Sequence, residues 1–367
     1  MKKLCLYGLF CFFILPLSGQ DFHYSMYRFA PLLLNPALTG VFDFDHKNED
    51  LRISSQYRQQ WRSIPSAYSA SPTPFTTTSV CVDHKIRLPK LIRRDFIGVG
   101  ALFYSDKTGD LNFGTQQSGL SFSYNKSINR KLYQYISFGF QNNFVKRSID
   151  YNNAFFDNQW SGTNFDPNLP SGETFPKNQF YYNDMGAGVA FQRYPDNHAN
   201  YAIGASVSHL NRPNQSFYNQ GTYNILLYRK LTIHADALYK LNYTWNVLPA
   251  LLYLRQGSAS EVNLGSYFQY HKDKNISFKI GALYRIVGNY QKAIASDALI
   301  LAYILNYGKF DIGFSYDTNT STLIQASRYR GAFEILLIYH EKVRKIKSKY
   351  DRFKEYVPDC PEYYYEN

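Results

Sequence analysis

Apolar and polar side chains alternate one by one through much of this sequence, and this period of two limits what the chain can fold into. From Phe310 to Asp317, aromatic or aliphatic residues occupy every second position, with Asp, Gly and Ser between them. The segments 119–125, 231–241 and 276–285 repeat the pattern. Successive side chains of a β-strand point to opposite faces of a sheet. Each segment therefore predicts a strand with one apolar and one polar face.

About fourteen segments of roughly ten residues carry this signal. They are residues 51–61, 75–84, 96–105, 113–126, 133–147, 180–193, 200–209, 231–242, 244–255, 260–270, 275–286, 295–306, 308–317 and 330–339. An even number of such strands is typical of a closed barrel with lipid outside and water inside. Closure is needed because lipid cannot hydrogen-bond to the free edge of an open sheet. We therefore predict an all-β fold, a closed antiparallel transmembrane β-barrel over residues 51–340.

The connections between the predicted strands alternate in length. Those after odd-numbered strands include 62–74, 148–179, 210–223 and 318–329. Those after even-numbered strands include links of a single residue near Tyr243 and Tyr307. Outer-membrane barrels have short periplasmic turns and longer extracellular loops. Because the first strand leaves a periplasmic N-terminus, the long connections are predicted to lie outside the cell.

The start of the chain resembles a secretory signal peptide. Met1-Lys2-Lys3 is basic, Leu4 to Leu17 is apolar and uncharged, and Ser18-Gly19 offers small residues for cleavage. We predict that residues 1–19 are removed and that the mature chain is exported to the outer membrane. No later apolar stretch reaches the roughly 20 residues that a membrane helix needs.

Two segments flank the predicted barrel. Residues 20–50 contain a proline-broken run and are predicted to be periplasmic or to lie in the lumen as a plug. Residues 341–367 are rich in lysine, and apolar residues recur at helical spacing from Val343 to Phe353. This spacing predicts a short basic amphipathic helix on the periplasmic side.

The net charge of +12 comes from basic residues that are scattered singly up to the final segment. An exported protein rarely meets nucleic acid, so anionic lipopolysaccharide or an acidic partner is the better complement. Two cysteines, Cys81 and Cys360, follow the signal peptide. One pair cannot form a disulfide framework, and two unpaired thiols are the simpler interpretation.

The chain carries none of the motifs of the common enzyme classes: no GxSxG, HExxH, Walker loop or GxGxxG after a strand. His234 and Asp236 share an inward face and could orient an imidazole as a base. A hydrated barrel wall explains them more simply. No enzyme activity, cofactor or metal is predicted, and the residue pattern supports a pore and a partner-holding barrel about equally.

A series of short motifs resembles the PorP/SprF family in order from one end of the chain to the other. They are Gln20-Asp21, Ser25-Met26-Tyr27, Pro31 to Gly40, Tyr57-Arg58-Gln59-Gln60-Trp61, Thr78-Ser79 with Asp83, Gly98-Val99-Gly100, Asp106 to Gly109, Asp166-Pro167-Asn168, Gly331 to Tyr339 and Cys360-Pro361. The chain departs from the family pattern at Leu38-Thr39, where an aromatic residue and Ala are usual, and at Arg28 and Ala30. The resemblance covers the whole mature chain.

The resemblance implies an outer-membrane component of the type IX secretion system and, in gliding bacteria, of the gliding apparatus. It implies that the barrel captures, helps export or anchors a large secreted adhesin through the adhesin's type B C-terminal domain. That domain would dock on the external loops, while the N-terminal segment and the tail face other secretion components. The candidate motif and partner-binding residues are Asn35, Pro36, Gly40, Tyr57, Arg58, Trp61, Asp106, Gly109, Asp166 and Pro167. The alternative function is a channel for small or hydrophobic solutes.

Overall fold

The computed structural model describes most of the chain after residue 20. The described ranges are 21–42, 49–62, 73–87, 95–129, 134–154, 156–166, 168–174, 177–194, 199–218, 224–273, 275–288, 294–321, 324–327 and 329–342. The predicted signal peptide, Pro167, Cys360 and the predicted C-terminal helix lie outside them.

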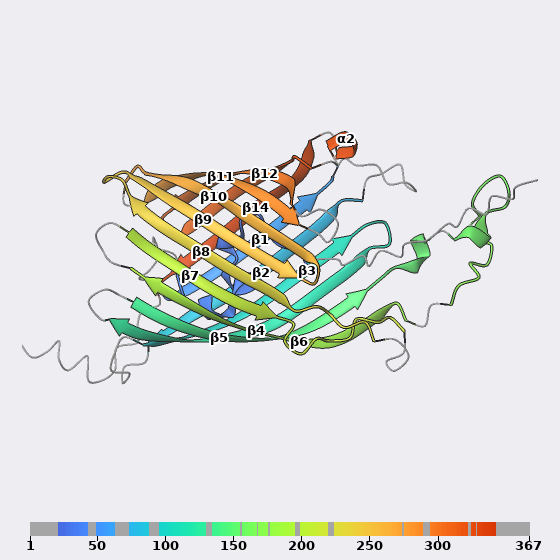
Figure 1. Cartoon of the computed structure of the whole chain (residues 1–367), viewed down its shortest axis with the longest axis horizontal. Coiled ribbons are helices and arrows are strands. Elements are labelled where there is room, and N and C mark those ends of the chain that lie inside the picture. Colours follow the sequence, from blue (N-terminus) through green and yellow to red (C-terminus); the bar gives the residue numbers. More distant parts are fainter. Residues whose placement is uncertain are drawn as a thin grey trace, which may run out of the picture.

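Fourteen strands form a closed barrel in which every strand pairs antiparallel with its sequence neighbours (Figure 1). The strands are β1 (Leu51–Gln60), β2 (Phe75–Arg87), β3 (Phe96–Thr108), β4 (Phe113–Asn129), β5 (Gln134–Ser148), β6 (Gln179–Arg193), β7 (Ala199–Ser208), β8 (Lys230–Lys240), β9 (Trp245–Gln256), β10 (Ala259–His271), β11 (Ile276–Gly288), β12 (Ala295–Tyr307), β13 (Phe310–Asn319) and β14 (Arg330–Glu341). β1 also pairs with β14, which closes the cylinder. The predicted closed barrel is confirmed, and the strand ends differ from the predicted ones by a few residues.

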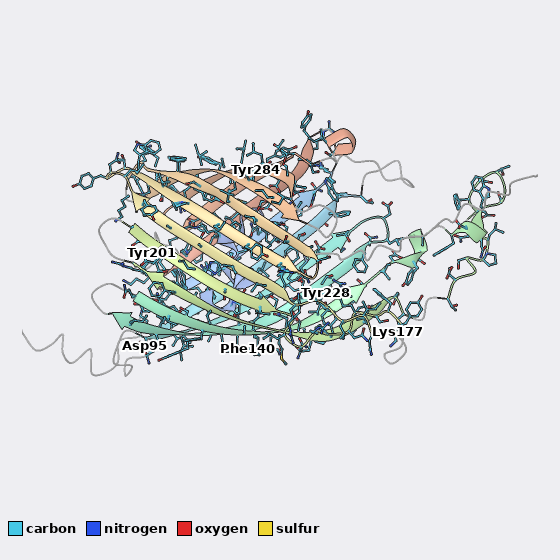
Figure 2. All side chains as sticks on the ribbon, viewed as in Figure 1. Asp95, Phe140, Lys177, Tyr201, Tyr228 and Tyr284 are labelled. Atoms are coloured by element: carbon cyan, nitrogen blue, oxygen red, sulfur yellow. The ribbon has the colours of Figure 1, made fainter. Side chains whose placement is uncertain are left out.

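The outward positions of the strands are apolar and exposed, as the alternation predicts. On β4, Leu120, Phe122 and Tyr124 face outward, while the residues between them face the lumen. Figure 2 shows side chains projecting from the outer surface, Phe140 and Tyr284 among them. Among the residues that the structure describes, no helix is both long and apolar enough to cross a bilayer.

The two ends of the barrel differ in the length of their connections. The end at which odd-numbered strands finish, called the loop end here, carries the connections 149–178 and 209–229. The helix α2 (Ile324–Ser327) belongs to the same end (Figure 1). The opposite end, called the turn end, carries short connections such as 241–244 and 308–309. Gly308 has a φ of 59°, which suits the two-residue turn between β12 and β13.

Residues 21–42 lie inside the barrel and are called the plug segment here. They contain η1 (Tyr27–Phe29), α1 (Pro31–Leu34) and η2 (Pro36–Leu38). The plug segment begins beside His209 at the loop end and finishes beside Arg52 at the turn end. Ser25, Asn35 and Thr39 are each 0% exposed, so the plug segment is interior to the molecule and fills much of the lumen.

The lumen is less polar than the alternation suggests. The inward side chains Ile300, Ile304 and Leu336 are fully buried and belong to one apolar cluster with Met26 and Leu34 of the plug segment. The expectation of a uniformly water-facing inner wall is therefore wrong for these strands. Apolar side chains are stable there because the plug segment covers them and removes them from water.

Cys81 is a buried free thiol on the inner face of β2, packed against Leu32 and Leu102. Its environment is an apolar contact between the barrel wall and the plug segment. A free cysteine at such a position behaves as a small apolar side chain.

Candidate functional site in the barrel lumen

The plug segment lies along a row of small residues on five neighbouring strands. Gly98 of β3 pairs with Ser123 of β4, which pairs with Gly139 of β5, then with Gly188 of β6 and Ser206 of β7. This set is called the glycine–serine row here. Since directly paired residues stand side by side across a sheet, the row forms a shallow track at right angles to the strands.

The backbone of the plug segment fills that track. A Cβ added at Gly139 would collide with the backbone of Pro36 and Ala37, and one added at Gly98 would collide with the carbonyl of Thr39. The serines donate hydrogen bonds to backbone carbonyls. Ser206 Oγ donates to Leu34 O at 2.9 Å, and Ser123 Oγ donates to Thr39 O at 2.6 Å. Larger side chains in the row would exclude the plug segment.

Asn35 fixes the middle of the plug segment. Its Oδ1 accepts from Ala37 N at 2.9 Å and so caps η2. Its Nδ2 lies 3.1 Å from Val189 O, 3.3 Å from Ala205 O and 3.2 Å from His234 Nε2. One buried amide therefore serves the local turn and three strands of the wall, β6, β7 and β8. Pro36 begins η2, where its fixed φ fits and no N–H is needed.

Gly40, near the end of the plug segment, has a φ of 69°, a left-handed conformation that glycine adopts without strain. Its N–H donates to Asp83 Oδ2 at 2.7 Å. Arg52 holds the same carboxylate through two hydrogen bonds, Nε at 2.9 Å and Nη2 at 2.7 Å. The exit of the plug segment toward β1 is thereby tied to the first two strands.

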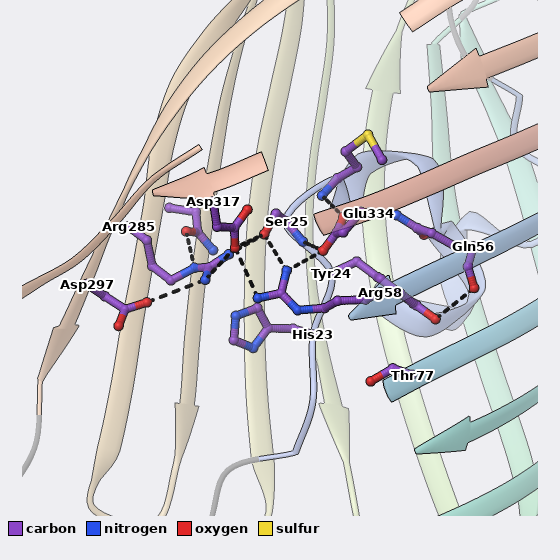
Figure 3. Close-up of polar contacts among 12 residues, drawn as sticks. His23, Tyr24, Ser25, Gln56, Arg58, Thr77, Arg285, Asp297, Asp317 and Glu334 are labelled. Carbon is purple, nitrogen blue, oxygen red and sulfur yellow. Dashed lines mark hydrogen bonds and ion pairs between the residues drawn. The ribbon is translucent and has the colours of Figure 1, made fainter. Parts of the chain in front are cut away.

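A charged cluster holds the opposite side of the plug segment (Figure 3). Arg58 of β1 is buried and pairs with Glu334 of β14 and with Asp317 of β13, the latter at 3.0 Å. Glu334 accepts from the backbone N–H of Ser25 at 2.6 Å and of Met26 at 3.0 Å. Ser25 Oγ donates to Asp317 Oδ2 at 2.6 Å. The carboxylates thus satisfy both the arginine and the plug backbone.

Arg285 of β11 extends the charged cluster. Its Nη1 lies 3.1 Å from Asp317 Oδ2 and 3.4 Å from Asp297 Oδ2 (Figure 3). Its Nε lies 3.5 Å from Glu261 Oε1. Arginine suits such a position because its planar group donates several hydrogen bonds in fixed directions and stays charged when buried.

The loop end of the plug segment is held by Asp21. Its Oδ2 lies 2.6 Å from His209 Nε2 and 3.5 Å from Lys230 Nζ, and His209 Nδ1 lies 2.9 Å from Asp184 Oδ1. Burial alone would lower the pKa of His209, but the two carboxylates outweigh burial and raise the pKa to about 9. Burial would raise the pKa of Asp21, yet His209 and Lys230 hold this pKa well below its usual range.

His234 and Asp236, the pair weighed as a catalytic base, both contact the plug segment. His234 lies against Asn35, and Asp236 Oδ1 lies 3.5 Å from Arg28 Nη1. Their own separation, Nδ1 to Oδ2, is 3.6 Å. Their surroundings are those of a structural contact between the wall and the plug segment.

The structure separates the predicted site residues into several places. Asn35, Pro36, Gly40 and Arg58 lie in the lumen and hold the plug segment. Tyr57 lies on the outward face of β1, and Trp61 packs on Phe75 at the loop end. Asp106 accepts a hydrogen bond from Thr77 Oγ1, and Gly109 lies in the turn after β3 with a φ of 67°. Asp166 lies in the connection 149–178. The motif residues therefore do not form one site.

Sequence reasoning missed the residues of the wall that receive the plug segment. Glu334 was not singled out, although it is the only charged residue in the otherwise apolar run from Gly331 to Tyr339. Gly139 and Gly188 were not singled out either, although each replaces a side chain on the polar face of a strand. Both signals are visible in the sequence, but only the pairing of β5 with β6 shows that Gly139 and Gly188 stand side by side.

Several solved barrels have a similar architecture at very low identity. The chain is similar to CymD, a monoaromatic hydrocarbon channel, with a TM-score of 0.49, 12% identity and coverage of 86% of this chain and 93% of that chain. It is similar to a FadL homologue of Pseudomonas aeruginosa with a TM-score of 0.45, 10% identity and coverage of 83% and 92%. At such values the likeness carries no argument about function.

No curated protein matches the sequence. A family model, described as type IX secretion system membrane protein PorP/SprF, matches residues 17–339. That range covers the plug segment, its two contact surfaces in the lumen and nearly all of the barrel. The chain therefore belongs to the PorP/SprF family and is an outer-membrane β-barrel of the type IX secretion system.

Proposed function

We propose that this barrel captures a large secreted adhesin at its loop end, through the adhesin's type B C-terminal domain, and so helps to export or anchor it. The proposal takes the loop end as the extracellular end and residues 1–19 as a cleaved signal peptide. Other secretion components would meet the turn end. Membership of a secretion-system family supports such partners.

The observation that carries the proposal is the filled lumen. The plug segment runs from one end of the barrel to the other and is held by buried ion pairs and by backbone contacts on opposite sides. A barrel occupied in this way offers its loops, and not a wide pore, as the working surface.

The connection 149–178 has the form of a docking element. Gln159 organises it, since its side chain bonds Phe156 N at 3.1 Å and Leu169 O at 3.0 Å. Trp160 and Phe165 face each other in an isolated β-bridge with ring centroids 5.1 Å apart, and both are well exposed. Exposed aromatic residues on a preorganised loop are typical of residues that dominate protein–protein binding.

The test is binding of the purified type B C-terminal domain to the full barrel in detergent. Removing both aromatic side chains, Trp160→Ala with Phe165→Ala, should weaken binding at least tenfold, on the order of 1.4 kcal/mol or more. Tyr243→Ala is the matched control, because Tyr243 is a fully exposed aromatic residue in a turn-end connection. Equal loss in both variants, or none in the double variant, would contradict docking on this loop.

The alternative is a channel for small or hydrophobic solutes. A cavity of about 80 Å³ lies between the plug segment and the wall, lined by Tyr24, Leu33, Tyr104, Leu252 and Leu254 among others. A steady conductance of the wild-type barrel in planar bilayers would favour this function. The capture proposal expects conductance only after the plug segment is displaced.

A further inference from the structure

The two edges of β6 are paired to different extents. On one side, β5 pairs with β6 along its whole length, from Gln134↔Arg193 to Ser148↔Gln179. On the other side, β7 pairs only with the stretch 187–193. The loop-end half of β6 therefore has a neighbouring strand on one edge and, within the described residues, none on the other.

The edge is open because β7 ends early. His209, directly after β7, has a φ of 59° and turns its side chain into the lumen toward Asp21 and Asp184. The chain then leaves the sheet, and among the described residues of the connection 210–229 only Leu210 N and the side chain of Asn211 still bond to β6. The residue that anchors the plug segment thus also ends the strand that would have covered β6.

Asn211 caps part of the open edge. Its Oδ1 accepts from Met185 N at 3.2 Å, and its Nδ2 donates to Asn183 O at 2.7 Å. Leu210 N donates to Met185 O at 2.9 Å. These contacts replace the missing strand at residues 183 and 185 and stop there.

The remaining backbone groups can be assigned from the register. Ile149 N donates to Asn178 O, so these two residues form a hydrogen-bonded pair of the ladder between β5 and β6. Bonded and non-bonded pairs alternate in an antiparallel ladder. The even-numbered residues of β6 therefore bond to β5, and Tyr181, opposite Lys146, belongs to a non-bonded pair. Gln179 and Tyr181 therefore direct their N–H and C=O groups to the open edge. No described residue bonds them there, and both side chains are exposed. Such an edge is a template for an added strand.

The surroundings of the edge are basic and aromatic. Tyr181 stacks on Phe144 with centroids 5.5 Å apart, on the outward face. Lys177, Arg212 and Arg229 are exposed, and none of them has an ion pair within the part of the chain that the structure describes. Figure 2 shows Lys177 at the loop end, near the start of β6. Three such cations beside an open edge complement an acidic strand.

We propose that the secreted partner binds by adding an extended, acidic strand to the open edge of β6 at residues 179–182. This inference rests on the proposed capture function and names its mode of attachment. Backbone hydrogen bonds to Gln179 and Tyr181 would supply affinity, and the cations would select the acidic strand. The connection 149–178 enters β6 at Gln179, next to the open edge, so one partner can contact both surfaces.

Proline at residue 181 is the direct test. Tyr181→Pro removes an N–H that faces the open edge and leaves the β5 ladder intact, which is the position that a strand tolerates for proline. Tyr181→Thr is the matched control, since it also loses the ring but keeps the N–H. Binding of the purified type B C-terminal domain should fall about tenfold or more in the proline variant relative to the threonine variant.

The outcomes separate the inference from the function on which it rests. If the domain does not bind the wild-type barrel, both are overturned. If the domain binds wild type and both residue-181 variants equally, strand addition is overturned and capture stands. Retained heat-modifiable migration of each variant on gels establishes that the barrel is folded.

Charge reversal gives a second arm that does not depend on proline. Lys177→Glu with Arg212→Glu should weaken binding of the domain about tenfold or more. If these cations instead bind lipopolysaccharide phosphates, the reversal would lower co-purified lipopolysaccharide and leave domain binding unchanged. That result would overturn the acidic-strand proposal.

Discussion

The two sides of the lumen hold the plug segment by different chemistry. From β3 to β7, the glycine–serine row lets the backbone of the plug segment approach the wall directly. From β11 round to β1, Arg58, Arg285, Asp317 and Glu334 hold it through buried charges. Close backbone contact depends on the absence of side chains, whereas a buried ion pair depends on the presence of every partner. The glycine–serine row sets where the backbone of the plug segment can lie. The buried charges set which residues of the plug segment, Ser25 and Met26, stand opposite the wall at that point.

Removing one buried carboxylate should have the largest effect. Glu334→Ala leaves Arg58 with one fewer anion and leaves the N–H groups of Ser25 and Met26 without their acceptor. Breaking a buried pair in this way costs about 3 to 5 kcal/mol. We expect a loss of this size in the free energy of unfolding, measured by denaturant titration of the barrel in lipid or detergent.

A matched control lies on the same strand. Glu341 pairs with Lys309 at 2.6 Å at the turn end, where both side chains are accessible to solvent. Exposed pairs contribute little, so Glu341→Ala should leave the unfolding transition nearly unchanged. A comparable loss in both variants would mean that the charged cluster does not act as a buried unit.

Adding a methyl group to the glycine–serine row should have the next largest effect. Gly139→Ala places a Cβ against the backbone of Pro36 and Ala37, which cannot rotate away. Overpacking of this kind costs about 1 to 3 kcal/mol, and we expect the plug segment to move rather than the wall. Single-channel recording should then detect openings that the wild-type barrel lacks.

Gly186 provides the comparison for that variant. It faces the same lumen from β6, but an added Cβ would meet its nearest atom, Val207 O, at 3.5 Å, an ordinary contact. Gly186→Ala should therefore leave conductance and stability as in wild type. If both alanine variants behave alike, the position of the plug segment does not depend on small residues in the glycine–serine row.

The smallest effect should be a pH dependence confined to the first residues of the plug segment. The pKa of His209 is raised from 6.5 to about 9, so its protonated form is stabilised in the folded protein. This stabilisation is complete below about pH 6.5 and is lost as the pH rises toward and beyond 9. Residues near Asp21 should become more accessible over that interval.

Maleimide labelling of a Phe22→Cys variant, in a Cys360→Ser background, would measure this accessibility. The same cysteine variant with His209→Gln has no titrating group at residue 209 and controls for the pH dependence of the labelling reaction. The ratio of the two labelling rates should change between pH 6.5 and 9. A constant ratio would show that protonation of His209 does not hold the plug segment.

The strands were predictable because each carries its own signal. Period-two alternation is local, and Leu120, Phe122 and Tyr124 show it without reference to the rest of the chain. The apolar inward side chains Ile300 and Ile304 escaped prediction because they are explained only by Met26 and Leu34 of a distant segment. The alternation is weakest where the plug segment supplies the apolar neighbour.

The sequence by itself determined the closed barrel, its strand count and the unequal connections, since alternation and turn residues act over a few neighbouring positions. Only the tertiary structure decided that the plug segment fills the lumen, that Gly98, Gly139 and Gly188 form one track, and that the edge of β6 is left open. The physical reason is that these features join residues far apart in the chain. Their geometry exists only once the cylinder has closed.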